Sequence, residues 1–227
     1  MPPEIFSCTN VNKIKVAFEG NIGAGKSTIL NHFKQFSSIC ETHDEPIKSW
    51  SNLDGINIFE KFNKDRKRWG LAFQSFVQLT ISDIYQAKQT KKVKLYERSL
   101  QSAHYCFTKN LLNSGYLQKD EFNILDAWYN WIMTNFNFHL DLIVYMRASP
   151  EICLKRIKKR NRIGEENITL EYLKELHELH DNWLLRDQEN LNTNTAVIII
   201  DADQQYSDVV QEIKKCQHKI LFGLTSI

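Results

Sequence analysis

The feature that most constrains this chain is a glycine-rich segment, residues 20–28, which reads GNIGAGKST. Its first eight residues match G-x-x-x-x-G-K-[ST] at every defined position, which is the pattern of a phosphate-binding loop. The segment follows an apolar run typical of a buried strand, Ile14–Glu19, and opens a helical stretch, STILNHFKQF. A strand, a tight glycine turn and a helix in this order belong to α/β folds, so this motif limits the fold class first.

The loop also predicts a triphosphate site. Its glycines allow backbone N–H groups to turn inward around phosphate, and the helix N-terminus adds partial positive charge. We expect Lys26 to bridge the β- and γ-phosphates of ATP and Ser27 to ligate Mg²⁺. The loop residues expected to contact ATP are Gly20, Asn21, Ile22, Gly23, Ala24, Gly25, Lys26, Ser27 and Thr28.

Further strands and helices alternate along the rest of the chain. The expected strands after the first are Val93–Glu97, Asp141–Met146 and Ala196–Asp201, with a weaker candidate at Ile39–Thr42. The runs IVYM and VIII are apolar throughout, as in strands covered on both faces of a parallel sheet. Helices are expected over residues 66–90, 101–113, 120–137, 150–160 and 169–187. This alternation predicts an α/β fold with a parallel sheet of about five strands, in a single domain over residues 13–227 that follows a flexible tail at 1–12.

The composition limits the classes of binding partner and the cellular compartment that we expect for this protein. The 29 Lys and Arg residues nearly balance the 27 Asp and Glu, a formal charge of +2, which argues against coating nucleic acid or an anionic membrane. No apolar run approaches the ~18 residues of a membrane span. The five cysteines are scattered without a CxxC pair, which indicates a reducing compartment. Residues 1–15 carry neither an apolar secretion core nor an arginine-rich mitochondrial presequence, so we expect a cytoplasmic protein, or one that also enters the nucleus.

Charged residues follow two of the expected strands. Asp44-Glu45-Pro46 comes after the weak strand, and Glu97-Arg98-Ser99 ends the strand that starts at Val93. Each group alone also fits a solvated turn or a surface ion pair. Open α/β sheets bind ligands at the carboxyl ends of their strands, so the joint position of the two groups behind a phosphate loop favours a functional role.

A basic run, KRIKKRNR at residues 155–162, is followed by the loop sequence IGEE. Arg156 and Arg160 are spaced i, i+4 and share one helix face. The run fits either a solvated or nucleic-acid-binding face, or a lid whose arginines neutralise a transferring phosphoryl group. Together with the phosphate loop, it favours a lid near residues 156–167.

Several longer strings carry a specific resemblance. They are GNIGAGKST, DEPIKSW, KRWGLAFQSFVQLT, YERSLQSAHYCF, DLIVYMRASPE and EYLKELHELHDNWL. From about Ile14 to Asp203 the sequence resembles the deoxynucleoside kinase family, and within it the mitochondrial thymidine kinases and the insect multisubstrate kinases. The resemblance implies a P-loop kinase three-layer sandwich, a homodimer, and phosphorylation of a deoxynucleoside 5′-hydroxyl with ATP and Mg²⁺.

The resemblance also implies residue roles in catalysis. Glu45 resembles the general base that takes the proton from the 5′-hydroxyl, and Arg98 the arginine beside that base. Glu97 looks like the acidic partner of Mg²⁺, alongside Ser27. Asp203 matches a position bordering the adenine of ATP. The lid arginines that match are Arg156, Arg160 and Arg162.

The acceptor pocket is implied in the same way. Its matching residues are Trp50, Phe73, Gln74, Val77 and Phe107. Because a glutamine amide offers both donors and an acceptor and can flip, Gln74 can pair with thymine or with cytosine. Relatives that prefer deoxycytidine and purines carry an Arg and an Asp where this chain has Ile81 and Ala103. We therefore expect thymidine and deoxycytidine to be good substrates and purine nucleosides to be poor ones.

One position departs from the family pattern. Asn63 stands where the family usually has a Tyr that holds the sugar 3′-hydroxyl, while Glu165 still matches the lid-side contact to that hydroxyl. Recognition of the 3′-hydroxyl is therefore expected to be weaker or rerouted.

Two other functions fit a phosphate loop. A thymidylate kinase would need cations for the acceptor phosphate, and the segment Asp44–Trp50 offers only Lys48. A non-catalytic nucleotide-binding switch would not need Glu45, Arg98 and the lid arginines together.

Overall fold

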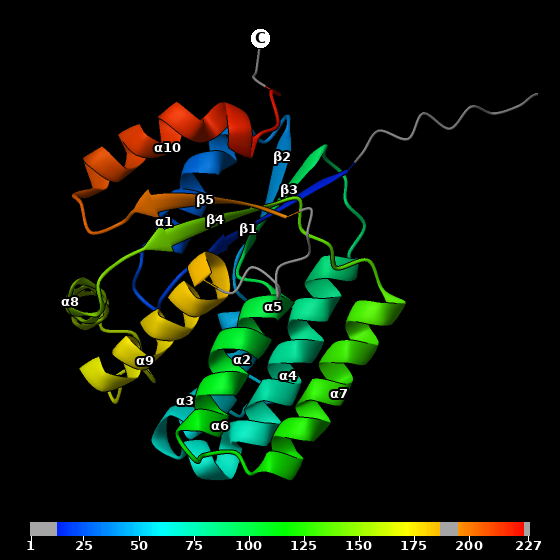
Figure 1. Ribbon diagram of the computed structural model, residues 1–227, viewed down its shortest axis with the longest axis vertical. Coiled ribbons are helices and arrows are strands. Elements are labelled where there is room, and N and C mark those ends of the chain that lie inside the picture. Colours follow the sequence, from blue (N-terminus) through cyan, green and yellow to red (C-terminus); the bar gives the residue numbers. More distant parts are fainter. Residues whose placement is uncertain (1–12, 187–194, 225–227) are drawn as a thin grey trace, which may run out of the picture.

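A five-stranded sheet runs through the computed structural model of the chain, which describes residues 13–186 and 195–224 (Figure 1). All neighbouring strands are parallel, in the order β2-β3-β1-β4-β5. The predicted fold class is confirmed, whereas the predicted tail at residues 1–12 lies outside the described residues. The strands are β1 (Ile14–Glu19), β2 (Cys40–His43), β3 (Val93–Glu97), β4 (Leu142–Arg147) and β5 (Ala196–Asp201).

Strand β1 lies at the centre because its side chains are buried on both faces. Val16 pairs in register with Leu95 of β3 and Leu142 of β4. Successive side chains of a strand point to opposite faces, so Val16 and Phe18 belong to one core and Ala17 to the other. The strand ends at the sheet edge where the phosphate loop begins.

Helices cover both faces of the sheet (Figure 1). The first core packs β1, β3 and β4 against α1, α8, α9 and α10, and the second packs the opposite face against α4, α7 and the segment around residues 100–113. No helix among the described residues is both long and apolar enough to cross a membrane. The helices are α1 (Lys26–Phe33), α2 (Ile47–Ser51), α3 (Ile58–Lys64), α4 (Arg66–Gln86), α5 (Leu100–Ser102), α6 (Lys109–Asn113), α7 (Lys119–Asn135), α8 (Pro150–Arg160), α9 (Leu170–Asp181) and α10 (Tyr206–Ile220).

Local chemistry explains several helix boundaries. Asp65 caps α4 by accepting from the backbone N–H of Arg68, and Pro150 stands at the first turn of α8. Asn161 ends α8 in the left-handed conformation, with φ 46°, and so separates the basic helix from the loop behind it. The predicted helix and lid loop are therefore distinct segments.

The remaining boundaries differ from the prediction in informative ways. The helix expected over residues 66–90 ends at Gln86, where Ala87 becomes extended. The helices expected over 101–113 and 169–187 contain π-helical turns, η2 (Ala103–Thr108) and η3 (Asn182–Arg186), and residue 187 lies outside the described residues. Helices α2, α3 and α10 were not predicted. A wider turn re-aims side chains without changing apolar periodicity much, so sequence patterns do not reveal it.

Candidate active site

The phosphate loop leaves β1 through glycines that no other residue could replace without strain. Gly20 has φ 135°, and a Cβ there would lie 2.4 Å from the carbonyl oxygen of Met146. Gly23 has φ 82°, and its Cβ would lie 2.7 Å from the carbonyl oxygen of Cys153. Asn21 ties the loop to α9, because its Nδ2 donates to the Leu173 carbonyl over 2.8 Å. The loop is thus a rigid cradle held by its neighbours.

Lys26 lies inside this cradle. Its Nζ donates to the carbonyl oxygens of Gly20 over 3.1 Å and Asn21 over 2.8 Å. Burial, and then Arg98 nearby, lower the pKa of Lys26 to about 8, while neighbouring carboxylates oppose the shift. The side chain is buried with only carbonyl partners, which suits a cation meant for anionic oxygens.

A cavity opens on the outer side of the cradle. Arg156 and Arg160 reach it from α8, so the two arginines predicted to share a helix face do so here. Asp203, predicted to border the adenine, does not line this cavity but a neighbouring one, and its Oδ1 accepts from the Ser149 backbone N–H over 2.6 Å and from the Ser149 hydroxyl over 2.9 Å. The residues lining this cradle cavity are Gly23, Ala24, Gly25, Lys26, Ser27, Thr28, Ile29, Glu97, Met146, Arg156, Lys159, Arg160, Ala202, Tyr206 and Val209.

The predicted metal ligands meet at the floor of this cavity. The Ser27 hydroxyl donates to Glu97 Oε1 over 2.8 Å. Burial, and then the charge of Glu45, raise the pKa of Glu97. No group of three or more His, Cys, Asp or Glu side chains within residues 13–186 and 195–224 is arranged to hold a metal ion. One hydroxyl and one carboxylate nevertheless fit Mg²⁺, which commonly takes one or two protein oxygens together with phosphate oxygens.

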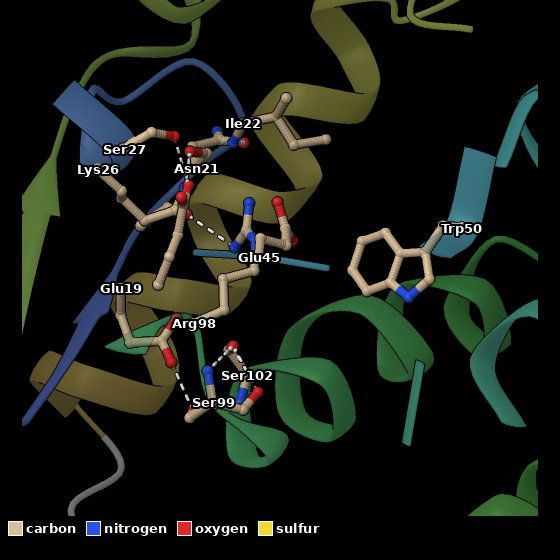
Figure 2. A network of polar contacts seen from close by, with 12 residues as sticks. Glu19, Asn21, Ile22, Lys26, Ser27, Glu45, Trp50, Arg98, Ser99 and Ser102 are labelled. Carbon is tan, nitrogen blue, oxygen red and sulfur yellow. Dashed lines mark hydrogen bonds and ion pairs between the residues drawn. The ribbon is translucent and has the colours of Figure 1, made fainter. Parts of the chain in front are cut away.

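Arg98 and Glu45 form a buried ion pair at the junction of β2 and β3 (Figure 2). Arg98 Nε lies 2.7 Å from Glu45 Oε1, with side chains 5% and 16% exposed. Arg98 Nη1 also donates to the Gly20 carbonyl over 3.0 Å, and its guanidinium lies 4.5 Å from the Phe107 ring centre. The residues that follow two neighbouring strands are therefore brought together beside the cradle.

A second cavity lies between this pair and α4. It contains every residue predicted for the acceptor pocket, which are Glu45, Trp50, Asn63, Phe73, Gln74, Val77, Ile81, Arg98, Ala103, Phe107 and Glu165. Lys26 and Ser27 line both cavities, so the two spaces meet at the cradle. The geometry allows a ligand in one cavity to face a ligand in the other.

The acceptor cavity is lined by aromatic rings and by one buried side-chain amide. Phe73 stacks on Phe62 with ring centres 4.5 Å apart and makes an edge contact with Trp50 at 5.4 Å. Gln74 is almost completely buried, and its Oε1 accepts weakly from the Thr108 hydroxyl over 3.4 Å. The amide of Gln74 therefore keeps most of its hydrogen-bonding capacity for a planar ligand between these rings.

The departure at Asn63 lies in the same cavity. Asn63 Nδ2 is buried and has no hydrogen-bond partner within the described parts of the chain. Glu165, by contrast, is held on two sides. Arg160 pairs with it through Nε and Nη2, both at 2.7 Å, and Arg162 Nη1 lies 3.2 Å away. Two of the arginines predicted for the lid therefore hold this carboxylate at the wall of the acceptor cavity.

Sequence reasoning missed part of the wall. The missed lining residues are Ile47, Phe59, Phe62, Ile168 and Tyr172. They lie on α2, α3, the loop at residues 161–169 and α9, where an apolar residue cannot be distinguished from ordinary core. Sequence reasoning also missed Glu19, a third glutamate near Arg98 besides Glu45 and Glu97, because this residue stands out only as the end of a predicted strand.

Comparison with known proteins identifies relatives of this chain. Residues 16–221 match the sequence model of a family described as deoxynucleoside kinase. Mitochondrial thymidine kinase 2 of Macaca fascicularis is 38% identical over 209 residues, covering 92% of this chain and 78% of the relative. Mitochondrial thymidine kinase 2 of Homo sapiens is 37% identical over 209 residues, which again cover 92% of this chain and 78% of the relative. Deoxycytidine kinase of Mus musculus is 33% identical over 235 residues, covering 88% of this chain and 90% of the relative.

Proposed function

The chain belongs to the deoxynucleoside kinase family, as its motifs predicted, and from this premise we propose that it phosphorylates the 5′-hydroxyl of pyrimidine deoxynucleosides. As a family member it is a phosphotransferase that uses ATP. Thymidine and deoxycytidine are the proposed substrates, and the products are nucleoside 5′-monophosphates for nucleotide salvage.

The observation that carries the proposal is the Arg98–Glu45 pair where the two cavities meet. Glu45 can accept the proton of an acceptor hydroxyl, because its carboxylate lines the acceptor cavity beside Arg98. Arg98 holds the base and adds positive charge toward the cradle. Lys26, Arg160 and Arg162 supply further cations, which a loose phosphoryl-transfer transition state requires.

We propose Mg²⁺ as the metal, held by Ser27 and Glu97. Bound Mg²⁺ would neutralise charge on the phosphates of ATP. The hydroxyl–carboxylate contact of 2.8 Å supports this assignment, as does the position of both groups in the cradle cavity. Arg156 and the backbone of residues 20–28 are the proposed partners of ATP, with Asp203 near its base.

The preference for pyrimidines rests on what surrounds Gln74. Ile81 and Ala103 line the cavity and are uncharged, which leaves room for the thymine methyl group and offers no charged partner to a purine. Gln74 can satisfy either pyrimidine by flipping its amide. A substrate panel in which deoxyguanosine gave the highest kcat/KM would refute this preference.

One assay tests the function. ATP turnover is measured with thymidine, with dTMP and with neither, for the wild type and for Glu45→Gln. We expect turnover with thymidine that falls on the order of 10²- to 10⁴-fold in Glu45→Gln. Turnover with dTMP alone would indicate a monophosphate kinase, and none with either would indicate a nucleotide-binding switch; both outcomes reject the proposal.

We also propose that the protein is a homodimer. Apolar side chains on α4 and α7 are about half exposed and lie on neighbouring helices; they are Leu79, Ile124, Trp128 and Trp131. Such a patch supports contact with a second copy. Sedimentation should give twice the 26.7 kDa chain mass, and Trp128→Ser with Trp131→Ser should give monomers.

The cytoplasm stays our prediction for the location of the protein. Fluorescence microscopy of the tagged chain distinguishes the cytoplasm from mitochondria.

A further inference from the structure

Glu19 is a completely buried carboxyl beside the proposed catalytic pair (Figure 2). As the last residue of β1 it shares a face with Ala17, toward α4 and α5. Its Oε1 accepts from the Ser99 hydroxyl, and its Oε2 has no hydrogen-bond partner in the described ranges. A buried carboxyl with one unpartnered oxygen costs stability, so a compensating role is expected at this position.

Ser99 connects this carboxyl to the catalytic arginine. The single proton of its hydroxyl goes to Glu19, while the hydroxyl oxygen accepts from the backbone N–H of Ser102 over 3.1 Å. In return, the Ser99 N–H donates to the Ser102 hydroxyl over 3.3 Å. Every polar group of Ser99 is therefore used, and its orientation is set from both sides.

Arg98, the neighbour of Ser99, has a strained backbone. Its φ is 68°, in the left-handed region that costs a non-glycine residue about 1–2 kcal/mol. Such a conformation persists only where surrounding contacts impose it. The strained turn directs the guanidinium to Glu45 and to the Gly20 carbonyl.

Three consecutive residues, the last two of the central strand and the first of the phosphate loop, impose the turn. The Phe18 carbonyl accepts from the Arg98 N–H over 3.0 Å, the Glu19 carboxyl accepts from Ser99, and the Gly20 carbonyl accepts from the Arg98 guanidinium. The first and last of these acceptors are backbone groups that any residue would supply. Glu19 alone acts through its side chain.

We propose that Glu19 is a positioning residue for phosphoryl transfer: by holding Ser99 it sets the turn that aims Arg98 at Glu45 and the cradle. This inference rests on the proposed function. A glutamine at position 19 keeps an oxygen that can accept from Ser99, whereas a leucine of similar size does not.

Two residues of the same turn make a matched test. Ser99→Ala removes the contact to Glu19, while Gln101→Ala disturbs the same short helix and removes only the bond from the Gln101 amide to the Phe138 carbonyl. We measure kcat with thymidine, KM for ATP and the thermal midpoint of each variant. We expect similar thermal midpoints, and a fall in kcat on the order of 10- to 100-fold for Ser99→Ala alone, with KM for ATP within about twofold.

A second pair tests Glu19 directly. Glu19→Leu should lose kcat as Ser99→Ala does, and Glu19→Gln should restore most of it. Equal kcat values for Ser99→Ala and Gln101→Ala would overturn the inference, and they decide the matter even if Glu19→Leu does not fold. An inactive wild type would instead refute the proposed function, so the two failures are distinguishable.

Discussion

The cradle and the acceptor cavity meet at Lys26 but are built in different ways. The cradle consists of nine consecutive residues whose glycine backbone is shaped by carbonyls of β4 and α8. The acceptor cavity draws side chains from α2, α3, α4, η2, the loop at residues 161–169 and α9. Backbone geometry therefore sets phosphate binding, while separate side chains set the choice of nucleoside. We therefore expect the cradle to tolerate almost no substitution, and substitutions in the acceptor cavity to alter substrate preference by degrees.

The largest effect is expected at Gly20. In Gly20→Ala, a Cβ 2.4 Å from the Met146 oxygen and a φ of 135° should lower the free energy of unfolding by about 3 kcal/mol or more and prevent ATP binding. Gly25→Ala is the matched control, because it has φ 98° but nothing within 4 Å of its Cβ. It should lose only about 1–2 kcal/mol in thermal unfolding. Equal losses would mean that the contact with β4 does not shape the cradle.

A smaller and purely functional effect is expected in the cavity. Gln74→Leu should lower kcat/KM for thymidine about 10- to 100-fold, because the base edge loses a buried partner. Gln78→Leu is the control on the same helix, since the Gln78 amide donates to the Leu125 carbonyl over 3.0 Å outside the cavity. Steady-state kinetics should show a loss for Gln74→Leu only. Equal losses in both variants would place base selection elsewhere.

The buried carboxyl of Glu19 lines neither cavity and is expected to make the stability of the protein depend on pH. Burial raises the pKa of Glu19 from 4.5 to about 7, against the charge of Arg98, the hydroxyls of Ser99 and Ser102 and the charge of Lys26. Tyr85 and Cys106 also face it. The folded state then holds a proton that the unfolded chain has released, so stability falls as pH rises from about 4.5 through about 7.

The matched measurement compares Glu19→Gln with the wild type. The variant carries no charge at any pH, so its stability relative to wild type should improve by about 2–3 kcal/mol between pH 5 and pH 8. Thermal midpoints at the two pH values give the difference. A constant difference would show that Glu19 does not titrate in this window.

The smallest expected effect is an improvement, a lower KM for thymidine after a substitution at Asn63. Asn63→Tyr should lower KM for thymidine about three- to tenfold, because a phenol reaches further than the unpartnered Asn63 amide toward the sugar 3′-hydroxyl. Steady-state kinetics with 3′-deoxythymidine provide the control, since a nucleoside without that hydroxyl should gain nothing. An unchanged or higher KM for thymidine would indicate that Asn63 already makes the contact.

Local patterns were sufficient for much of the fold. The strands at Ile14–Glu19, Val93–Glu97 and Ala196–Asp201 were predicted with the observed boundaries, from short apolar segments that alternate with helical ones. The expectation that the run VIII is covered on both faces was wrong, because β5 is an edge strand and leaves Ile199 49% exposed. The π-helical turn at Ala103–Thr108 left no comparable signal in the sequence. The aromatic wall residues Phe59 and Phe62 could not be told from core.

By itself, then, the sequence determined the phosphate loop, since conformation there depends on neighbouring residues and on glycine. It also named Glu45 and Arg98 as strand-end charges, without any distance between them. Only the tertiary structure decided that they pair at 2.7 Å, that Arg98 adopts a left-handed turn, and that Glu19 and Ser99 lie beneath it. These contacts join residues about 50 to 80 positions apart, and the pairing of β1, β2 and β3 brings them together. Local preferences carry no information about that pairing, because its free energy comes from burying faces distant in the chain.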